Sequence, residues 1–201
     1  MKRISSVQDI IDCVNYYGIL PFWSEDSFSA WQLSDVSFMK LWNLREKAVN
    51  SLQVAYGKFV GKKATFVSLA AFPHLASLRR DGYDFDSLTD EGRAPRREID
   101  VMTAVGSEPT PSYALSKSLG IKGFDGVVTS LQNKTYLCLH FKHSYMGTAL
   151  LSRPEDIFGY DFVRSAYNLS VEQNAQILLD TCPGLHELDE KLRDKSLLSA
   201  I

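Results

Sequence analysis

Amide, hydroxyl and lysine side chains between residues 117 and 142 have the chemistry that contact with nucleic acid requires. Gln and Asn can each form two hydrogen bonds with adenine, and the methyl group of Thr can contact the methyl group of thymine. Lysine side chains neutralise backbone phosphates. We therefore predict base contacts from Thr129, Gln132 and Asn133, and phosphate contacts from Lys117, Lys122, Lys134 and Lys142.

A second polar segment, from residue 79 to residue 86, allows two interpretations. In the first, its two guanidinium groups bind phosphate in a cleft, and its carboxylates bind a metal or exchange protons. In the second, Arg–Asp pairs and a glycine turn lock a linker between two domains. We favour the second interpretation, the lock. The metal-binding part of the first interpretation is weakened because the spacing of the Asp residues does not fit the calcium-binding loop of an EF-hand. The residues concerned are Arg79, Arg80, Asp81, Tyr83, Asp84 and Asp86.

Other site chemistry is missing from the sequence. It contains no nucleophile–base pair, no phosphate-binding loop and no dinucleotide fingerprint, so we expect no catalytic residue, no metal and no cofactor. The three cysteines, Cys13, Cys138 and Cys182, are widely spaced and follow no disulfide or zinc pattern.

Asp9 and Asp12 interrupt the first apolar run, which argues against a signal peptide, and no run is long enough to span a membrane. A soluble, cytoplasmic protein is the expectation.

Residues 96–152 predict the elements that must position the first group of side chains. An amphipathic pattern indicates a first helix that ends at Gly106. Thr110 is suited to cap a second helix and Pro111 to begin it. A third apolar stripe follows Gly123, and the side chains predicted to contact bases lie off that stripe.

The pattern then changes from helix to strand. Alternating residues predict strands over 135–141 and 148–151, and residues 142–147 form the tip between them. Three helices followed by a hairpin is the order of a winged helix-turn-helix. In that interpretation the third helix is the recognition helix and residues 142–147 are the wing.

The flanking sequence predicts two further parts. Ser6 can cap a helix over residues 7–17, and a hairpin is predicted near residues 54–68 around a Gly-Lys-Lys turn. Ser170 and Gln173 have the spacing of a capping box at the start of a later helix. The polar stretch 83–92 has no regular pattern and is the predicted domain boundary.

The predicted fold class is therefore α+β with three parts. A small N-terminal α+β domain covers residues 1–90, and a winged-helix-like form is an open alternative for it. A winged helix-turn-helix covers residues 91–153. A helical extension covers residues 154–201.

Charge is distributed unevenly over these parts, although the net charge of the chain is only −2. Residues 93–153 carry eight Lys and Arg against four Asp and Glu, which gives +4. Residues 1–92 sum to −1 and residues 154–201 to −5. The predicted winged helix is thus the only basic part, as phosphate contact requires, and the C-terminal part is acidic.

Several strings in the sequence resemble a known bacterial family. The most specific is Arg79-Arg80-Asp81-Gly82-Tyr83-Asp84-Phe85-Asp86, and further similar strings occur between residues 52 and 160. These strings resemble AlkZ-related proteins, of the AlkZ and YcaQ type. The resemblance implies winged-helix modules and a relation to DNA glycosylases that act on alkylated or crosslinked DNA. Those glycosylases use a Gln-x-Gln motif, which this sequence lacks.

Three functions remain open on this basis. We favour a winged-helix protein that binds double-stranded DNA without catalysis. A diverged DNA glycosylase-like repair enzyme, with a cleft around residues 79–86, is the first alternative. The second is a protein-interaction module in which the winged helix is a scaffold and the acidic C-terminal part covers the basic face. The oligomeric state, any protein partner and any DNA sequence or lesion preference cannot be predicted from the sequence.

Overall fold

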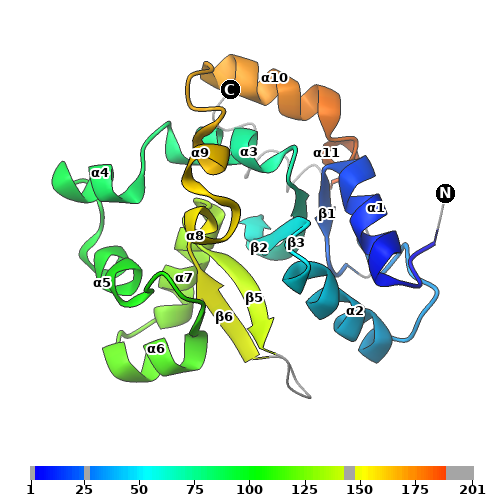
Figure 1. The fold of residues 1–201 in the computed structure, drawn as a ribbon, viewed down its shortest axis with the longest axis horizontal. Coiled ribbons are helices and arrows are strands. Elements are labelled where there is room, and N and C mark those ends of the chain that lie inside the picture. Colours follow the sequence, from blue (N-terminus) through cyan, green and yellow to red (C-terminus); the bar gives the residue numbers. More distant parts are fainter. Residues whose placement is uncertain (1–2, 25–27, 143–147, 189–201) are drawn as a thin grey trace.

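The computed structural model describes residues 3–24, 28–142 and 148–188, without the side chain of Lys142. Over these ranges the chain has a mixed α/β architecture with two antiparallel sheets of three strands each. The two sheets lie next to each other in the middle of the molecule, and helices surround them (Figure 1). No helix in these ranges is long and apolar enough to cross a membrane. The predicted wing tip and the end of the predicted extension lie outside the described residues.

The first sheet contains the hairpin that the sequence predicts. Strands β2 (Val54–Val60) and β3 (Lys63–Ser68) form this hairpin, and β1 (Ile19–Pro21) pairs with the other edge of β3. Gly61 and Lys62 connect β2 to β3 with φ angles of 56° and 61°. Both residues therefore adopt the left-handed conformation that a two-residue type I′ turn requires. This turn places Lys62 at the end of the hairpin.

Two helices pack near the first sheet and enclose a core. They are α1 (Val7–Tyr17) and α2 (Phe38–Asn50). Ser6 caps α1 as predicted, and Asp9 completes a capping box by accepting a hydrogen bond from the Ser6 amide at 3.0 Å. The core between α1, α2 and the sheet also contains Phe141 from the second half of the chain. The two halves are therefore packed together rather than separate.

The second half contains the three helices and the hairpin in the predicted order. Helices α5 (Arg96–Ala104), α6 (Ser112–Leu119) and α7 (Phe124–Asn133) precede strands β5 (Cys138–Lys142) and β6 (Thr148–Ser152). A short additional strand, β4 (Thr110–Pro111), pairs with β6 and gives the sheet order β4–β6–β5.

The prediction that Thr110 caps α6 is wrong. The backbone of Thr110 pairs with Leu151 of β6, and its hydroxyl donates to the carbonyl of Glu108 at 2.9 Å. Helix α6 begins only after Pro111 and has no side-chain cap. Pairing with a strand that is distant in the sequence has overridden a local capping preference, as tertiary context commonly does.

The described end of the chain packs against the N-terminal half. Helix α3 (Phe72–Arg80) contacts two of the later helices, and β1 contacts another. Val163, Leu178 and Leu185 share a core with Phe59 and Phe72. Residues 154–188, the described part of the predicted extension, thus complete a core that begins in the first sheet. The later helices are α8 (Pro154–Phe158), α9 (Tyr160–Arg164), α10 (Val171–Thr181), which has the predicted capping box, and α11 (Gly184–Glu187).

The segment 83–92 contains a helix where the sequence predicts irregular structure. Helix α4 spans Phe85–Asp90. Phe85 is buried, and its ring packs edge-on against the ring of Tyr136 with 5.2 Å between the centroids. One aromatic side chain among polar neighbours is enough to anchor this segment to the core of the second half.

Candidate nucleic-acid interface

Helix α7 holds most of the side chains that the sequence predicts to contact DNA. It begins after Gly123, which has a φ of 77°, and it buries Phe124, Val128 and Leu131 against the core of the second half. These are the residues of the predicted apolar stripe. The helix ends before Thr135, which has a φ of 64° and is itself fully buried. Both ends of α7 are therefore set by backbone conformations that favour a turn.

Strand β2 of the first sheet packs against α7 on the side where the base contacts were predicted. The side chain of Gln132 is 2% exposed, and its Oε1 accepts a hydrogen bond from the backbone amide of Lys58 at 2.7 Å. Gly57 permits this close approach, because a Cβ atom there would lie 2.9 Å from the Phe59 ring and 3.3 Å from Gln132 Oε1. The predicted base contact by Gln132 does not fit this buried position.

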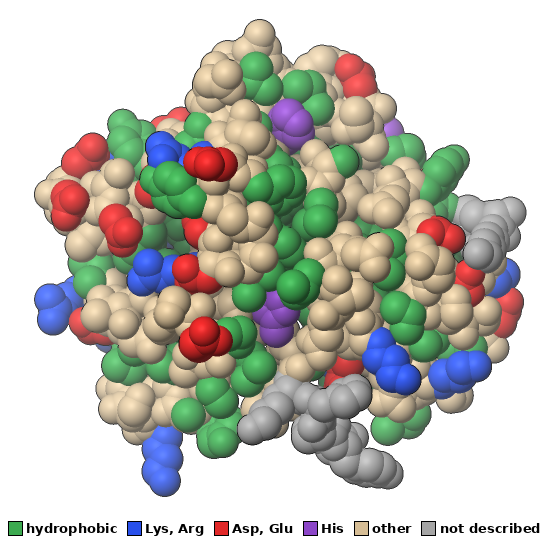
Figure 2. Space-filling model, viewed as in Figure 1, with side chains coloured by type: hydrophobic (Ala, Val, Ile, Leu, Met, Phe, Trp, Pro, Cys, Tyr) green, Lys and Arg blue, Asp and Glu red, His purple; other side chains and the backbone are tan. Residues whose placement is uncertain are grey.

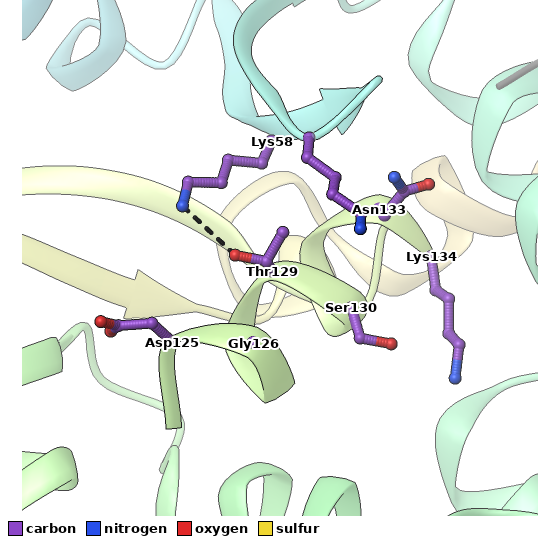
Figure 3. A pocket seen from close by; sticks show the side chains of 8 residues that line it. Lys58, Asp125, Gly126, Thr129, Ser130, Asn133 and Lys134 are labelled. Atoms are coloured by element: carbon purple, nitrogen blue, oxygen red, sulfur yellow. Dashed lines mark hydrogen bonds between the residues drawn. The ribbon is translucent and has the colours of Figure 1, made fainter. Parts of the chain in front are cut away.

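A surface groove of about 630 Å³ lies between α7 and the β2–β3 hairpin. Figure 3 shows Lys58 reaching from β2 towards Thr129, with Asp125 at one end of the groove and Lys134 at the other. Three residues that the sequence predicts to contact DNA, Thr129, Asn133 and Lys134, line this groove. The residues that line the groove are Lys58, Lys62, Asp125, Gly126, Thr129, Ser130, Asn133 and Lys134.

The three lysines of the groove differ in their partners. Lys134 Nζ donates to both carboxylate oxygens of Glu98 at 2.8 Å, and Glu98 also accepts from Ser130. Lys58 Nζ donates to the neutral hydroxyl of Thr129 at 3.2 Å. Lys62 is exposed and has no ion-pair partner among the described residues. Lys58 and Lys62 therefore keep positive charges that no carboxylate neutralises within the described part of the chain.

Lys58 and Lys62 line this groove but were not among the residues predicted to contact DNA. They belong to the N-terminal half, outside the part that was predicted to bind DNA. The Gly-Lys-Lys turn was visible in the sequence, but only the packing of β2 on α7 brings this turn to the predicted recognition helix. No periodicity within either segment indicates that packing.

The other predicted phosphate contacts lie outside the groove. Lys117 is on α6 and Lys122 precedes α7, and both are exposed. The backbone of Lys142 ends β5, but its side chain and residues 143–147 lie outside the described residues. Contacts between DNA and these three lysines or the wing remain predictions.

The segment 79–86 contains a buried arginine that joins several elements. The Arg80 side chain has no exposed surface; it donates to the hydroxyl and the carbonyl of Thr135, at 3.0 and 2.6 Å, and pairs with Glu155. Its guanidinium also donates to the Tyr167 hydroxyl at 3.1 Å and lies 4.6 Å from the centre of the Tyr136 ring. These contacts connect α3 to α8 and to the loop after α7. The carboxylate partner of Arg80 is Glu155 and not one of the aspartates that the lock interpretation paired with it.

The remaining residues of this segment are divided between turns and a second pocket. Asp81 ends α3 in a left-handed conformation, and the carbonyl of Tyr83 accepts a hydrogen bond from the Tyr136 hydroxyl at 2.9 Å. Arg79 is half-buried, and burial lowers its pKa. Asp84 accepts a hydrogen bond from the Tyr160 hydroxyl at 2.9 Å.

An acidic pocket of about 160 Å³ adjoins the lock. Asp84, Asp86, Glu155 and Asp156 line it together with Tyr136, Tyr160 and Arg153. Figure 2 shows acidic side chains gathered on this face over α4 and beside α8 and α9. Glu155 is paired with Arg80 and Asp84 with Arg164, whereas Asp86 and Asp156 have no ion-pair partner among the described residues. The lining of this pocket therefore differs from that of the lysine-lined groove.

Comparison with known proteins identifies one relationship. A protein-family model described as AlkZ related matches residues 4–195, which is nearly the whole chain. No curated protein and no solved structure matches the chain.

Proposed function

The chain belongs to the AlkZ-related family, and we propose that it is a winged-helix protein that binds double-stranded DNA without glycosylase activity. The family relates the chain to DNA repair glycosylase-like proteins. The absence of a Gln-x-Gln motif from the sequence supports a non-enzymatic role. A cytoplasmic location and the existence of a protein partner remain predictions.

The order of elements in the second half supports the winged-helix proposal. Three helices, α5, α6 and α7, precede the β5–β6 hairpin, and the short strand β4 pairs with β6 of that hairpin. This order supports the proposal, because a winged helix-turn-helix combines helices with a β-hairpin wing. The wing would then be the connection between β5 and β6.

The observation that carries the DNA-binding proposal is the lysine-lined groove beside α7. Lys58 and Lys62, which have no carboxylate partner among the described residues, line one surface hollow with Thr129 and Asn133 from the other half of the chain. Lys134 lines the same hollow but is paired with Glu98. Lysine ammonium groups neutralise phosphate, and hydroxyl and amide side chains donate hydrogen bonds to phosphate oxygens. A nucleic-acid backbone is the common biological ligand with this chemistry.

The first test is fluorescence anisotropy with a labelled random-sequence duplex at two salt concentrations. We expect binding that weakens steeply as salt is raised, because phosphate contact releases counterions. Lys62→Asn should weaken binding, and Asn is suited to the left-handed φ of this position. Lys63→Gln is the matched control, because Lys63 is the exposed neighbour that does not line the groove.

Two results would contradict this proposal. If the duplex does not bind even at low salt, the chain does not bind DNA, and the protein-interaction alternative takes its place. If Lys62→Asn and Lys63→Gln weaken binding equally, the groove is not the binding surface.

A diverged repair enzyme is the second candidate, and the acidic pocket favours it. Burial raises the pKa of the Asp156 carboxyl above its ordinary value, and Asp156 lines the pocket beside Glu155 and Tyr160. Release of a base from an alkylated duplex, lost in Asp156→Asn, would establish this function. Our proposal expects no base release from any damaged duplex.

A further inference from the structure

We propose that α7 does not read base sequence and that Lys58 and Lys62 hold DNA beside this helix through its phosphates. This inference rests on the proposed function and makes it more specific, because it replaces a recognition helix inserted in the major groove with a sequence-independent backbone contact. Three properties of the groove carry it.

The first property is steric. The major groove of B-DNA is about 12 Å wide, and an α-helix with its side chains has a diameter of about 10–12 Å, so the groove admits one helix without a companion. In this protein β2 lies against α7, and 2.7 Å separates Gln132 Oε1 from the Lys58 amide nitrogen. A helix with a strand at this distance cannot enter the major groove on that side.

The second property is that three polar side chains of α7 already have partners within the protein. Gln132 is committed to the backbone of Lys58, Thr129 accepts from the side chain of Lys58, and Ser130 donates to Glu98 at 2.8 Å. Asp125 and Gly126 are the exposed residues of α7. Gly126 has no side chain that could contact a base, and the carboxylate of Asp125 repels the phosphates that flank any base it could approach.

The third property is the division of charge in the groove. Lys134 is neutralised by Glu98, which is only 7% exposed and accepts from Lys134 through both oxygens. Lys58 and Lys62 have no carboxylate partner among the described residues, and both face the same hollow as the half-buried amide of Asn133. The groove thus offers two cations to a backbone phosphate, and the half-buried amide of Asn133 can donate to the same phosphate.

The test compares duplexes of equal length but different sequence, containing only A·T pairs, only G·C pairs, or a mixture. The proposal expects their Kd values to agree within about twofold, because a base-reading protein gains roughly 10³-fold or more over non-specific binding. Lys62→Asn should reduce the slope of log K against log salt by about 0.9, the value for one phosphate contact. Asp125→Asn should raise the affinity for all three duplexes by the same factor.

A charge-neutral double variant tests the assignment of Lys134. Glu98→Gln combined with Lys134→Gln removes both members of the pair and leaves the net charge unchanged. The proposal expects an unaltered salt slope, because Lys134 is already neutralised. A slope reduced as much as by Lys62→Asn would show that Lys134 contacts phosphate and would overturn this assignment.

The binding measurements distinguish failure of this inference from failure of the proposed function. A preference of tenfold or more for one duplex would show that bases are read and would overturn the inference, while DNA binding itself would stand. Absence of binding to all three duplexes would overturn both.

Discussion

Arg80 shows how one side chain can hold distant parts of this chain together. Its contacts reach Thr135, Glu155 and Tyr167, which are 55, 75 and 87 residues away in the sequence. A buried charge with several partners is stabilising only while all of them are present, because the loss of one leaves another unpaired. The sequence interpretation of this segment as a lock therefore depends on Arg80, and the neighbouring Arg79 has no comparable set of contacts.

Replacement of Arg80 should have a large effect on stability. We expect Arg80→Ala to lower the free energy of unfolding by about 3–5 kcal/mol, because Glu155 and the carbonyl of Thr135 lose their partner. Urea unfolding measures this difference. Arg79→Ala is the matched control and should cost less, because its guanidinium has buried nitrogens without partners among the described residues. Equal losses in the two variants would argue against the lock.

His140 should make stability depend on pH. It is 6% exposed, and burial lowers its pKa to about 4, below the value of about 6.5 for an unfolded chain. Its contribution is therefore fully present above about pH 6.5 and is lost as the pH falls towards 4, because the unfolded state binds the proton first. The slope over this interval is about 1.4 kcal/mol per pH unit.

The measurement is urea unfolding between about pH 7 and about pH 5, compared between the unaltered protein and His140→Gln. Other titrating groups contribute similarly to both proteins, so the difference between the two slopes isolates His140. The same pH dependence in both proteins would mean that His140 titrates normally in the folded state.

At the scale of elements, the contact between α7 and β2 decides what the predicted recognition helix can do. The polar side of α7 meets a strand edge that needs hydrogen-bond acceptors, and Gln132 supplies one to Lys58. A side chain that looks suited to adenine in the sequence is thus used inside the protein. The same packing brings the hairpin lysines to the groove.

The substitution Gln132→Leu tests whether the hydrogen bond between Gln132 and the Lys58 amide stabilises the protein. We expect a loss of about 1–3 kcal/mol in the free energy of unfolding, because the partly buried amide of Lys58 would lose its acceptor. Thermal or urea unfolding provides the measurement. Gln53→Leu, the same change at an exposed position, should alter stability by less than about 0.5 kcal/mol. If stability is unchanged and the DNA sequence preference is altered, the original prediction that Gln132 contacts a base would be supported instead.

At the scale of the whole molecule, the described parts of the chain share their cores. Phe141 from the second sheet packs in the N-terminal core, and Val163 and Leu178 from the later helices pack with Phe59 and Phe72. The described helices after residue 154 contact α3 and β1 and do not line the lysine groove. Cover of the basic face by the acidic C-terminal part would therefore require the residues after 188.

A truncated chain tests this shared core. We expect a chain that ends at residue 153 to lose its cooperative thermal transition, because the core of Phe59 and Phe72 would be exposed to water. Circular dichroism during heating detects that transition. A chain that ends at residue 188 keeps every residue of the described cores and should retain the transition. Cooperative unfolding of the shorter chain would show that residues 154–188 are an independent extension.

The sequence by itself determined the local elements and the family. The capped helix after Ser6, the hairpin near residues 54–68 and the three helices before β5 were predictable because periodicity, caps and turns act between residues that are near neighbours in the chain. The AlkZ-related resemblance was also visible in the sequence, and the family model confirms it. Of the residues that line the groove, Thr129, Asn133 and Lys134 were among those predicted to contact DNA.

Only the tertiary structure decided which of these side chains remain available. Lys58 and Gln132 are 74 residues apart, and Thr110 pairs with Leu151 in the second sheet. Because both contacts join distant parts of the sequence, no local sequence pattern predicts either of them. The free energy that selects such contacts comes from burying apolar faces against each other, and this is largely non-directional. The polar residue that then becomes buried, as Gln132 does, depends on which element packs there. Because β2 packs on α7, the candidate site is the groove between α7 and the β2–β3 hairpin and not the polar face of α7 by itself.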